Sequence, residues 1–207
     1  MARTMTKIQF INHASVLISD GETSVLSDPW YFGSAFNNGW NLLYENQNDD
    51  INKTLKLATH IWISHEHPDH FSIPFFKRYH KIIKDRNIII LFQKTDDKRV
   101  IDFLNSLELL VIELEFNTKT IIGKDFSVTC LKDGFYDSGL YVETSSYNIL
   151  NLNDCEVTTK ERIEEIKHSI GKVDCLLTQF SYAAWKGGRE NSTWRKQAAI
   201  EKIETIR

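Results

Sequence analysis

Six consecutive residues in the first half of the chain carry three imidazoles and two carboxylates. The run His65-Glu66-His67-Pro68-Asp69-His70 directly follows an apolar stretch, Ile61-Trp62-Ile63. Such a stretch indicates a buried strand, so the polar run lies on the loop that leaves it. Imidazole nitrogens and carboxylate oxygens suit zinc, iron or manganese, and ligands on a loop can converge on one point. The sequence therefore predicts a metal site at a strand end; the alternative is a histidine-rich surface loop with incidental metal affinity.

The order of residue types in this run, His-x-His-x-Asp-His, resembles the signature of the metallo-β-lactamase superfamily. The resemblance implies that His65 and His67 bind one metal ion and that Asp69 and His70 bind a second. It further implies two divalent ions, zinc as the first choice and iron or manganese as alternatives, with a hydroxide between them. Such a hydroxide replaces a Ser or Cys nucleophile. Asp69 is then also a catalytic candidate, because it could handle the proton.

Length, charge and cysteine usage limit the class of protein. The chain has 207 residues, 42% of them hydrophobic, which suffices for a substantial core, and we expect a single domain over residues 1–207. Twenty-five basic against 28 acidic residues give a net charge of −3, which argues against nucleic acid as a partner. No apolar run approaches the roughly 20 residues of a membrane span. Cys130, Cys155 and Cys175 are far apart in apolar or strand-like runs, which indicates reduced thiols and a cytoplasmic location.

Periodicity predicts a domain that mixes helices and strands. The chain should begin with strands from Ile8 to Ser19 and from Ser24 to Ser27, joined at an Asp-Gly turn, and continue with a long loop over about residues 30–52. Further strands are expected at 58–64, 87–92, 109–114, 118–122, 126–132, 139–144, 148–153 and 173–179. Helices are expected at 73–84, from 95 or 96 to 107, from 158 to 170 and from about 193. The α+β fold class, an αββα sandwich of two sheets with outer helices, follows from the resemblance.

Two further carboxylates are candidate ligands. Asp154 follows the apolar strand at 148–153, and the resemblance implies that it bridges the two metals; ordinary turn chemistry is the alternative. Most superfamily members place another histidine just before the preceding strand, but no histidine occurs between His80 and His168. Asp137 lies at the corresponding position. A carboxylate there would move metal preference from zinc towards iron or manganese; the alternative is a turn residue beside a weak or empty first site.

The family also has a last histidine near its carboxyl end, and no such residue follows His168. We therefore expect either a fragment of a longer protein, truncated at the C-terminal end of the sandwich, or an incomplete second site.

Other segments resemble one branch of the superfamily. Residues 11–18, 27–30 and 179–185 are similar to the branch that includes CMP-N-acetylneuraminate hydroxylase-like proteins and, more distantly, ascorbate-phosphate lactonases. The branch implies that His13 and Asp28 lie behind the ligands and orient His65 or His67. A strand-edge histidine and a turn aspartate are the alternatives.

The segment before the last expected helix carries candidate substrate contacts. Tyr182, Trp185 and Lys186 could reach an anionic small molecule over the metals, or simply line a solvated loop. The sequence names neither the substrate nor the oligomeric state.

Three functional hypotheses follow. The first is a metal-dependent hydrolase that uses a metal-bound hydroxide on an ester, lactone, amide or phosphoester of a small molecule. The second is an iron-dependent, oxygenase-like protein with an electron-donating partner, because the chain has no Cys-x-His Rieske pattern of its own. The third is a non-catalytic domain that keeps the fold with an incomplete site.

Overall fold

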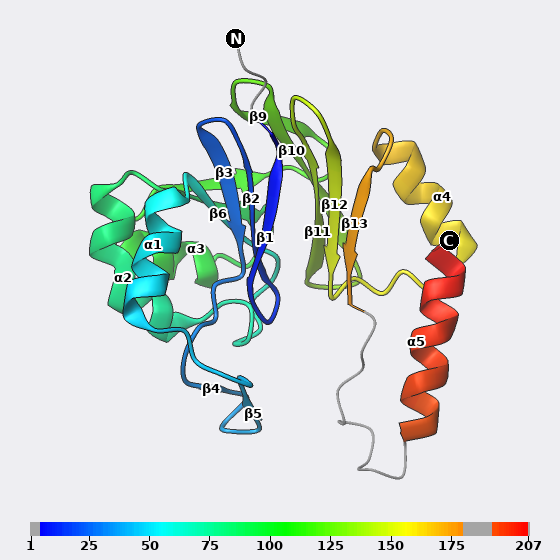
Figure 1. Ribbon diagram of the computed structural model, residues 1–207, viewed down its shortest axis with the longest axis horizontal. Coiled ribbons are helices and arrows are strands. Elements are labelled where there is room, and N and C mark those ends of the chain that lie inside the picture. The colour runs from blue at the N-terminus through cyan, green and yellow to red at the C-terminus, as the bar shows by residue number, and fades with distance from the viewer. Residues whose placement is uncertain (1–4, 180–191, 207) are drawn as a thin grey trace.

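Two β-sheets pack face to face, with helices on both outer surfaces, in the computed structural model of this chain (Figure 1). The structure describes residues 5–179 and 192–206. The first sheet has six strands in the order β1-β2-β3-β6-β7-β8, and the second has five in the order β13-β12-β11-β10-β9. This is the αββα sandwich that the sequence analysis expected, so the predicted fold class is confirmed.

The first sheet begins with an antiparallel meander and continues with parallel crossovers. The antiparallel strands are β1 (Lys7–Asn12), β2 (Ser15–Asp20) and β3 (Thr23–Ser27). The parallel strands are β6 (His60–Ile63), β7 (Ile89–Gln93) and β8 (Val111–Leu114). The crossover helices are α1 (Asn48–Leu57), α2 (Ile73–Asp85) and α3 (Arg99–Ser106), which cover the outer face. A short hairpin, β4 (Ser34–Ala35) and β5 (Trp40–Asn41), lies between β3 and α1.

The second sheet is antiparallel except at one edge. Its antiparallel strands are β9 (Lys119–Gly123), β10 (Phe126–Asp133), β11 (Asp137–Glu143) and β12 (Asn148–Asn153). β13 (Cys175–Thr178) is parallel to β12 and follows α4 (Lys160–Ser169). The last helix, α5 (Ser192–Ile206), lies beside α4, and the Lys202 ammonium donates to the Cys155 carbonyl at 3.1 Å.

Three apolar cores follow from these layers. The core between the sheets contains Trp62, Leu91 and Val128, and the core under the first three helices contains Leu55 and Phe76. A smaller core joins α4 to the outer face of the second sheet. Because the central strands β6, β7, β10 and β12 are buried on both faces, they read as largely apolar runs, which is why their positions were predictable.

The structure differs from the sequence-based elements in two places. The strand expected from Ile8 to Ser19 is broken by a turn at His13-Ala14, where His13 has a φ of +44°. The Ser27 hydroxyl holds this turn: it donates to the Ala14 carbonyl at 2.8 Å and accepts from the Val16 amide at 3.0 Å. No local glycine or proline announces the turn, because a side chain from β3 supplies its hydrogen bonds.

The long loop expected at 30–52 is the second difference, because helix α1 begins within it at Asn48. Only Ile51, Thr54 and Leu55 of α1 are buried, so its apolar face is too narrow to give a clear helical period. Asp49 and Asp50 in the first turn favour the helix through its macrodipole.

The state of the cysteines and the length of the helices are relevant to the predicted cytoplasmic location. Cys130, Cys155 and Cys175 are free; the first two are buried and the third is half-buried. No helix in the described part of the chain is long and apolar enough to cross a bilayer. The cytoplasmic location itself stays a prediction.

Candidate metal centre

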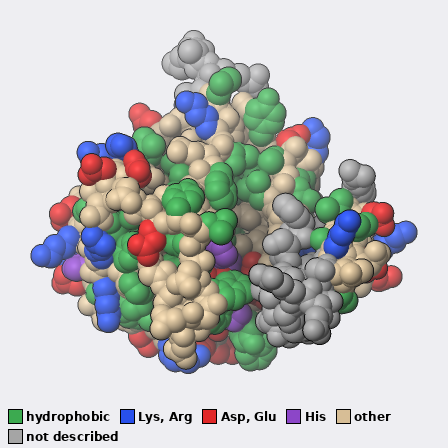
Figure 2. All heavy atoms as spheres, turned by 60° about the horizontal axis from the view of Figure 1, so that its bottom comes forward, with side chains coloured by type: hydrophobic (Ala, Val, Ile, Leu, Met, Phe, Trp, Pro, Cys, Tyr) green, Lys and Arg blue, Asp and Glu red, His purple; other side chains and the backbone are tan. Residues whose placement is uncertain are grey.

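The predicted ligands converge on one edge of the sandwich, at the bottom of Figure 1. His13 lies in the β1–β2 turn, the run from His65 to His70 follows β6, Asp137 opens β11, and Asp154 follows β12. Figure 2 looks onto this edge, where histidine side chains are visible among apolar ones. The arrangement follows from the parallel pairing of β3 with β6, which brings the carboxyl ends of both strands to the same edge.

Asp28 anchors the start of the metal loop, the segment from His65 to His70. Its buried carboxylate accepts from the Ser64 amide and from the Ser64 hydroxyl, each at 2.8 Å. The same carboxylate lies 3.1 Å from His70 Nδ1 and accepts from the Asn153 side-chain amide. A His70 imidazole that donates through Nδ1 presents the lone pair of Nε2 towards the centre, which is the state a metal ligand requires.

His70 Nε2 lies between two carboxylates. It is 3.4 Å from Asp69 Oδ2 and 3.4 Å from Asp154 Oδ2. Burial alone would lower the pKa of His70, but hydrogen bonds to Asp154, Asp28 and Asp69 raise that pKa well above its usual value. The carboxylates of Asp69 and Asp154 therefore favour a cation at Nε2, and either a proton or a metal ion can supply it.

Asp69 is ionised and incompletely satisfied. Burial opposes its charge, but hydrogen bonds from His13 and His70 hold the pKa of the carboxyl below its usual range. Its Oδ1 is buried and has no hydrogen-bond partner among the described residues. A buried carboxylate oxygen without a partner is costly, and a bound cation would satisfy it. The donor set thus fits a metal ion.

His65, His67 and Asp137 form the other side of the centre. His65 Nε2 is 2.9 Å from His67 Nδ1, and His65 Nδ1 is 3.5 Å from Asp137 Oδ1. Burial, and then the neighbouring His70, lowers the pKa of His65 to about 4, so its imidazole is neutral at neutral pH. Burial, and then the Asp154 charge, raises the pKa of Asp137 to about 6. The neutral His65 imidazole can therefore bind a metal ion without first losing a proton, whereas a metal ion at Asp137 would displace the proton that the raised pKa favours there.

Two triads in the described part of the chain have the spacing of metal ligands. They are His13, Asp69 and His70, and His65, His70 and Asp154, and the donor atoms in each lie within 4.8 Å of one another. Donors around one ion at about 2.0–2.2 Å are themselves about 3–3.5 Å apart. The triads contain four of the six predicted ligands, and the other two, His67 and Asp137, lie beside His65. His70 belongs to both triads, whereas the resemblance assigned it to one metal. The roles of all six as ligands stay predictions.

The residues expected behind the ligands are placed differently from the sequence analysis. His13 and Asp28 were expected to orient His65 or His67. In the structure His13 Nε2 lies 3.1 Å from Asp69 Oδ2, and Asp28 contacts His70. The order of the residues in the loop does not indicate which of its side chains points towards the β1–β2 turn and which towards the end of β3. The expected substrate contacts Tyr182, Trp185 and Lys186 lie outside the described residues.

Sequence reasoning missed the polar side chains that hold the loop in place. The Gln93 side-chain amide donates to the Ser64 carbonyl at 3.1 Å and to the Tyr136 carbonyl. The Ser138 hydroxyl donates to the Ser64 carbonyl at 2.7 Å, and Asn153 donates to Asp28 and to the Ser64 hydroxyl. Gln93 and Asn153 are the last residues of apolar strands. A polar residue at the end of an otherwise largely apolar strand was the sequence feature that could have indicated their role.

Three of the ten non-glycine residues with positive φ in the described part of the chain lie at this edge. His13, Asp28 and Asn153 have φ values of +44°, +37° and +48°, in the left-handed region. Such conformations cost on the order of 1–3 kcal/mol each for non-glycine residues and cluster at functional sites. All three side chains contact the candidate ligands or the residues that hold them.

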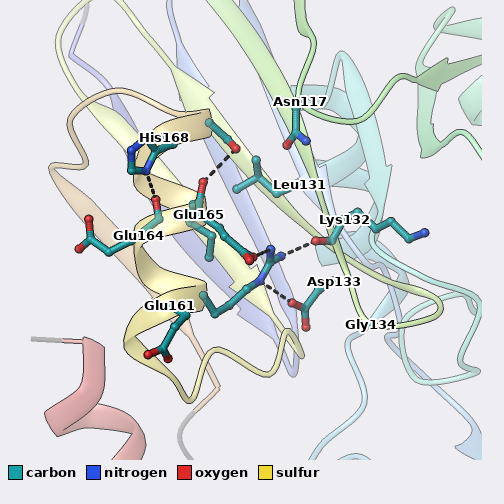
Figure 3. A pocket seen from close by; sticks show the side chains of 12 residues that line it. Asn117, Leu131, Lys132, Asp133, Gly134, Glu161, Glu164, Glu165 and His168 are labelled. Atoms are coloured by element: carbon teal, nitrogen blue, oxygen red, sulfur yellow. Dashed lines mark hydrogen bonds and ion pairs between the residues drawn. The ribbon is translucent and has the colours of Figure 1, made fainter.

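Two cavities lie near the centre without forming it. One of about 890 Å³ opens between α4 and the end of β10, where Arg162 bonds Asp133 and Glu165 at 3.0 Å each (Figure 3). None of the six predicted ligands lines it, and its arginine is already paired. A second cavity, of about 730 Å³, borders the metal loop at Glu66 and the β10–β11 turn at Tyr136. None of the six predicted ligands lines this second cavity either, but Glu66 of the loop from His65 to His70 does.

Comparison with known families identifies the class of protein. Residues 7–190 match the family described as the beta-lactamase superfamily domain, so the chain belongs to that superfamily. It is 28% identical over 206 residues to cytidine monophosphate-N-acetylneuraminic acid hydroxylase of Mus musculus, covering 92% of this chain and 33% of that protein. It is 27% identical over 203 residues to the inactive Homo sapiens counterpart, covering 92% and 38%. The chain thus spans about a third of these relatives, and the expected resemblance to CMP-N-acetylneuraminate hydroxylase-like proteins is confirmed.

Solved structures share the fold at low sequence identity. CmlA, a diiron beta-hydroxylase from Streptomyces venezuelae, superposes with a TM-score of 0.62 at 17% identity, covering 98% of this chain and 43% of CmlA. The short form of human tRNase Z gives 0.51 at 13% identity, covering 96% and 87%. Proteins named as a hydroxylase and as a metallo hydrolase therefore both share this fold, so the fold does not choose the reaction.

Proposed function

We propose that this chain carries a dinuclear iron centre that activates oxygen, as part of a hydroxylase. The donor set carries the proposal. Asp69, Asp137 and Asp154 share the edge with the imidazoles, and Asp137 stands where the superfamily resemblance implies a histidine. Sites rich in carboxylate suit iron or manganese better than zinc. The hydroxylase names of relatives that match 92% of the chain, and the diiron beta-hydroxylase of the same fold, support this choice.

The chemistry requires electrons from outside the described site. Hydroxylation inserts one oxygen atom of dioxygen into a C–H bond and reduces the other to water, with two electrons and two protons. Bound ferrous iron would supply the reduction of dioxygen. Because this chain has no Cys-x-His Rieske pattern, we propose an electron-transfer protein or domain as the partner.

The protein's own contribution is to hold the donors in their binding forms. Asp28 fixes the His70 tautomer, burial keeps His65 neutral, and hydrogen bonds keep Asp69 ionised. These groups lie on the segments that directly follow β3 and β6, so the sheet positions them before any ion binds.

The cavity beside Glu66 and Tyr136 is the proposed substrate site. Phe71, Phe92 and Phe103 line it, as do Lys94, Arg99 and Lys132. Lys94 and Arg99 are paired with carboxylates, whereas the described contact of Lys132 is with the Phe116 ring, at 5.9 Å. Because Glu66 and Asp96 also line the cavity, the anionic group of a substrate would bind at Lys132. The apolar walls suit a small molecule with an apolar or planar part.

A metal-dependent hydrolase is the second candidate. The adjacent imidazoles of His65 and His67, 2.9 Å apart, favour it because nitrogen donors suit zinc. Zinc there would make a bound water a nucleophile near neutral pH.

Metal analysis and oxygen uptake separate these candidates. The chain is purified without added metal, moles of iron, zinc and manganese per chain are measured, and the iron-loaded protein is tested for reductant-dependent oxygen consumption. One to two irons with oxygen uptake would support the hydroxylase. Two zinc ions with esterase or lactonase activity and no oxygen uptake would support the hydrolase.

Matched variants test the site itself. His67→Ala and Asp154→Ala should each lose bound metal while the far-ultraviolet circular dichroism spectrum stays unchanged, because both side chains lie at the edge and outside the three cores. His168→Ala on the exposed face of α4 is the control and should retain metal. Unchanged metal content in both site variants would overturn the assignment.

A further inference from the structure

His13 lies at the candidate metal centre but does not belong to the loop from His65 to His70. It lies in the β1–β2 turn, and the left-handed backbone there points its imidazole towards Asp69. The Trp30 ring packs edge-on against it at 5.0 Å and the Trp40 ring at 6.4 Å. Backbone and neighbouring rings therefore fix the direction of this imidazole before any ligand binds.

The distances at His13 are those of a coordination sphere. His13 Nε2 lies 3.1 Å from Asp69 Oδ2, and that oxygen lies 3.4 Å from His70 Nε2. Both values fall within the separation of about 3–3.5 Å between donors that share one ion at about 2.0–2.2 Å. The three donor atoms all lie within 4.8 Å of one another.

A hydrogen bond alone leaves part of the arrangement unexplained. If His13 only donated a proton to Asp69, the carboxylate would be satisfied at Oδ2. Its Oδ1 would still be buried without a hydrogen-bond partner among the described residues. A cation beside Asp69 accounts for that oxygen and for the convergence of two imidazoles on one carboxylate.

We propose that His13 is a protein ligand of the second metal ion, through Nε2, together with Asp69 and His70. This inference rests on the proposed metal centre and extends it. The ion would then tie the β1–β2 turn of the first sheet to the loop after β6. The exposed fraction of the His13 side chain, 33%, leaves this ion open to solvent or substrate on one side.

The test compares two substitutions at one position. His13→Ala removes both ligand and hydrogen-bond donor, whereas His13→Gln keeps an amide that can donate to Asp69 but binds metal poorly. His168→Ala is the control. Each purified chain is stripped, its circular dichroism and melting are recorded to establish folding, and it is titrated with Co²⁺ while the visible spectrum and Trp fluorescence are followed.

The wild-type chain and the control should bind two Co²⁺ ions, and quenching of Trp30 and Trp40 should accompany the second. Both His13 variants should retain one ion and bind the second more than about tenfold more weakly. Wild-type affinity for two ions in His13→Gln would overturn the ligand role and leave His13 as a positioning residue for Asp69. A wild-type chain that binds no ion would instead overturn the proposed function.

Discussion

Asp28 shows how one buried side chain can set the chemistry of another. Its carboxylate receives hydrogen bonds from Ser64 and Asn153 and faces His70 Nδ1, all within a region closed to solvent. The imidazole can present Nε2 to a metal only while Asp28 accepts at Nδ1. The residue that selects the tautomer lies 42 positions before the ligand, at the end of a neighbouring strand.

Asp28→Asn should therefore weaken metal binding by about 10–100-fold. Asparagine tolerates the left-handed backbone at this position, so the loss would come from the amide group that replaces an acceptor and not from backbone strain. Competition with a chromophoric chelator measures the affinity, and Asp49→Asn on exposed α1 serves as the control. Equal affinities in the two variants would contradict the role given to Asp28.

Asp137 should decide which metal the first site prefers. Asp137→His replaces an oxygen donor with a nitrogen donor beside His65 and His67, so the ratio of zinc to iron bound from an equimolar mixture should rise several-fold. Elemental analysis after equilibrium dialysis gives this ratio. A variant with the wild-type ratio would indicate that Asp137 does not coordinate the ion.

At the scale of elements, predictability followed burial. The strands β6, β7, β10 and β12 are buried on both faces, and the sequence placed each within about two residues. The His13 turn could not be predicted, because the Ser27 hydroxyl that holds it comes from another strand. Four of the six predicted ligands lie within six consecutive residues, so the sequence could point to them. Ser64, Gln93 and Asn153, by contrast, act through contacts that only the folded sheets create.

The corner where the two sheets meet supplies a test of their packing. Gly123 ends β9, and a Cβ added there would lie 2.1 Å from Thr23 Oγ1 and 2.8 Å from Thr23 Cβ at the start of β3. Gly123→Ala should lower the free energy of unfolding by about 1–3 kcal/mol, because one sheet must shift to make room. Urea unfolding measures the loss. Adding Thr23→Ala should restore part of it, and purely additive effects would contradict the close approach.

At the scale of the whole molecule, the metal edge and the apolar cores contribute separately to stability. The two sheets and five helices bury three cores that contain none of the six predicted ligands. The edge, by contrast, gathers several carboxylates, some of them fully buried, around few cations. An ion that binds only the folded chain reduces this repulsion and adds to the free energy of unfolding by mass action.

Chelation should thus lower the melting temperature without unfolding the chain at 25 °C. At free metal of about 100 times Kd, binding contributes about 2.7 kcal/mol. For a chain of this length that corresponds to roughly 5–10 °C, at about 2–4 °C per kcal/mol. Differential scanning calorimetry with and without a chelator measures the shift, and Asp154→Ala should already melt near the chelated wild type and respond little. A melting temperature that the chelator lowers equally in both proteins would place the stabilising ion somewhere other than this edge.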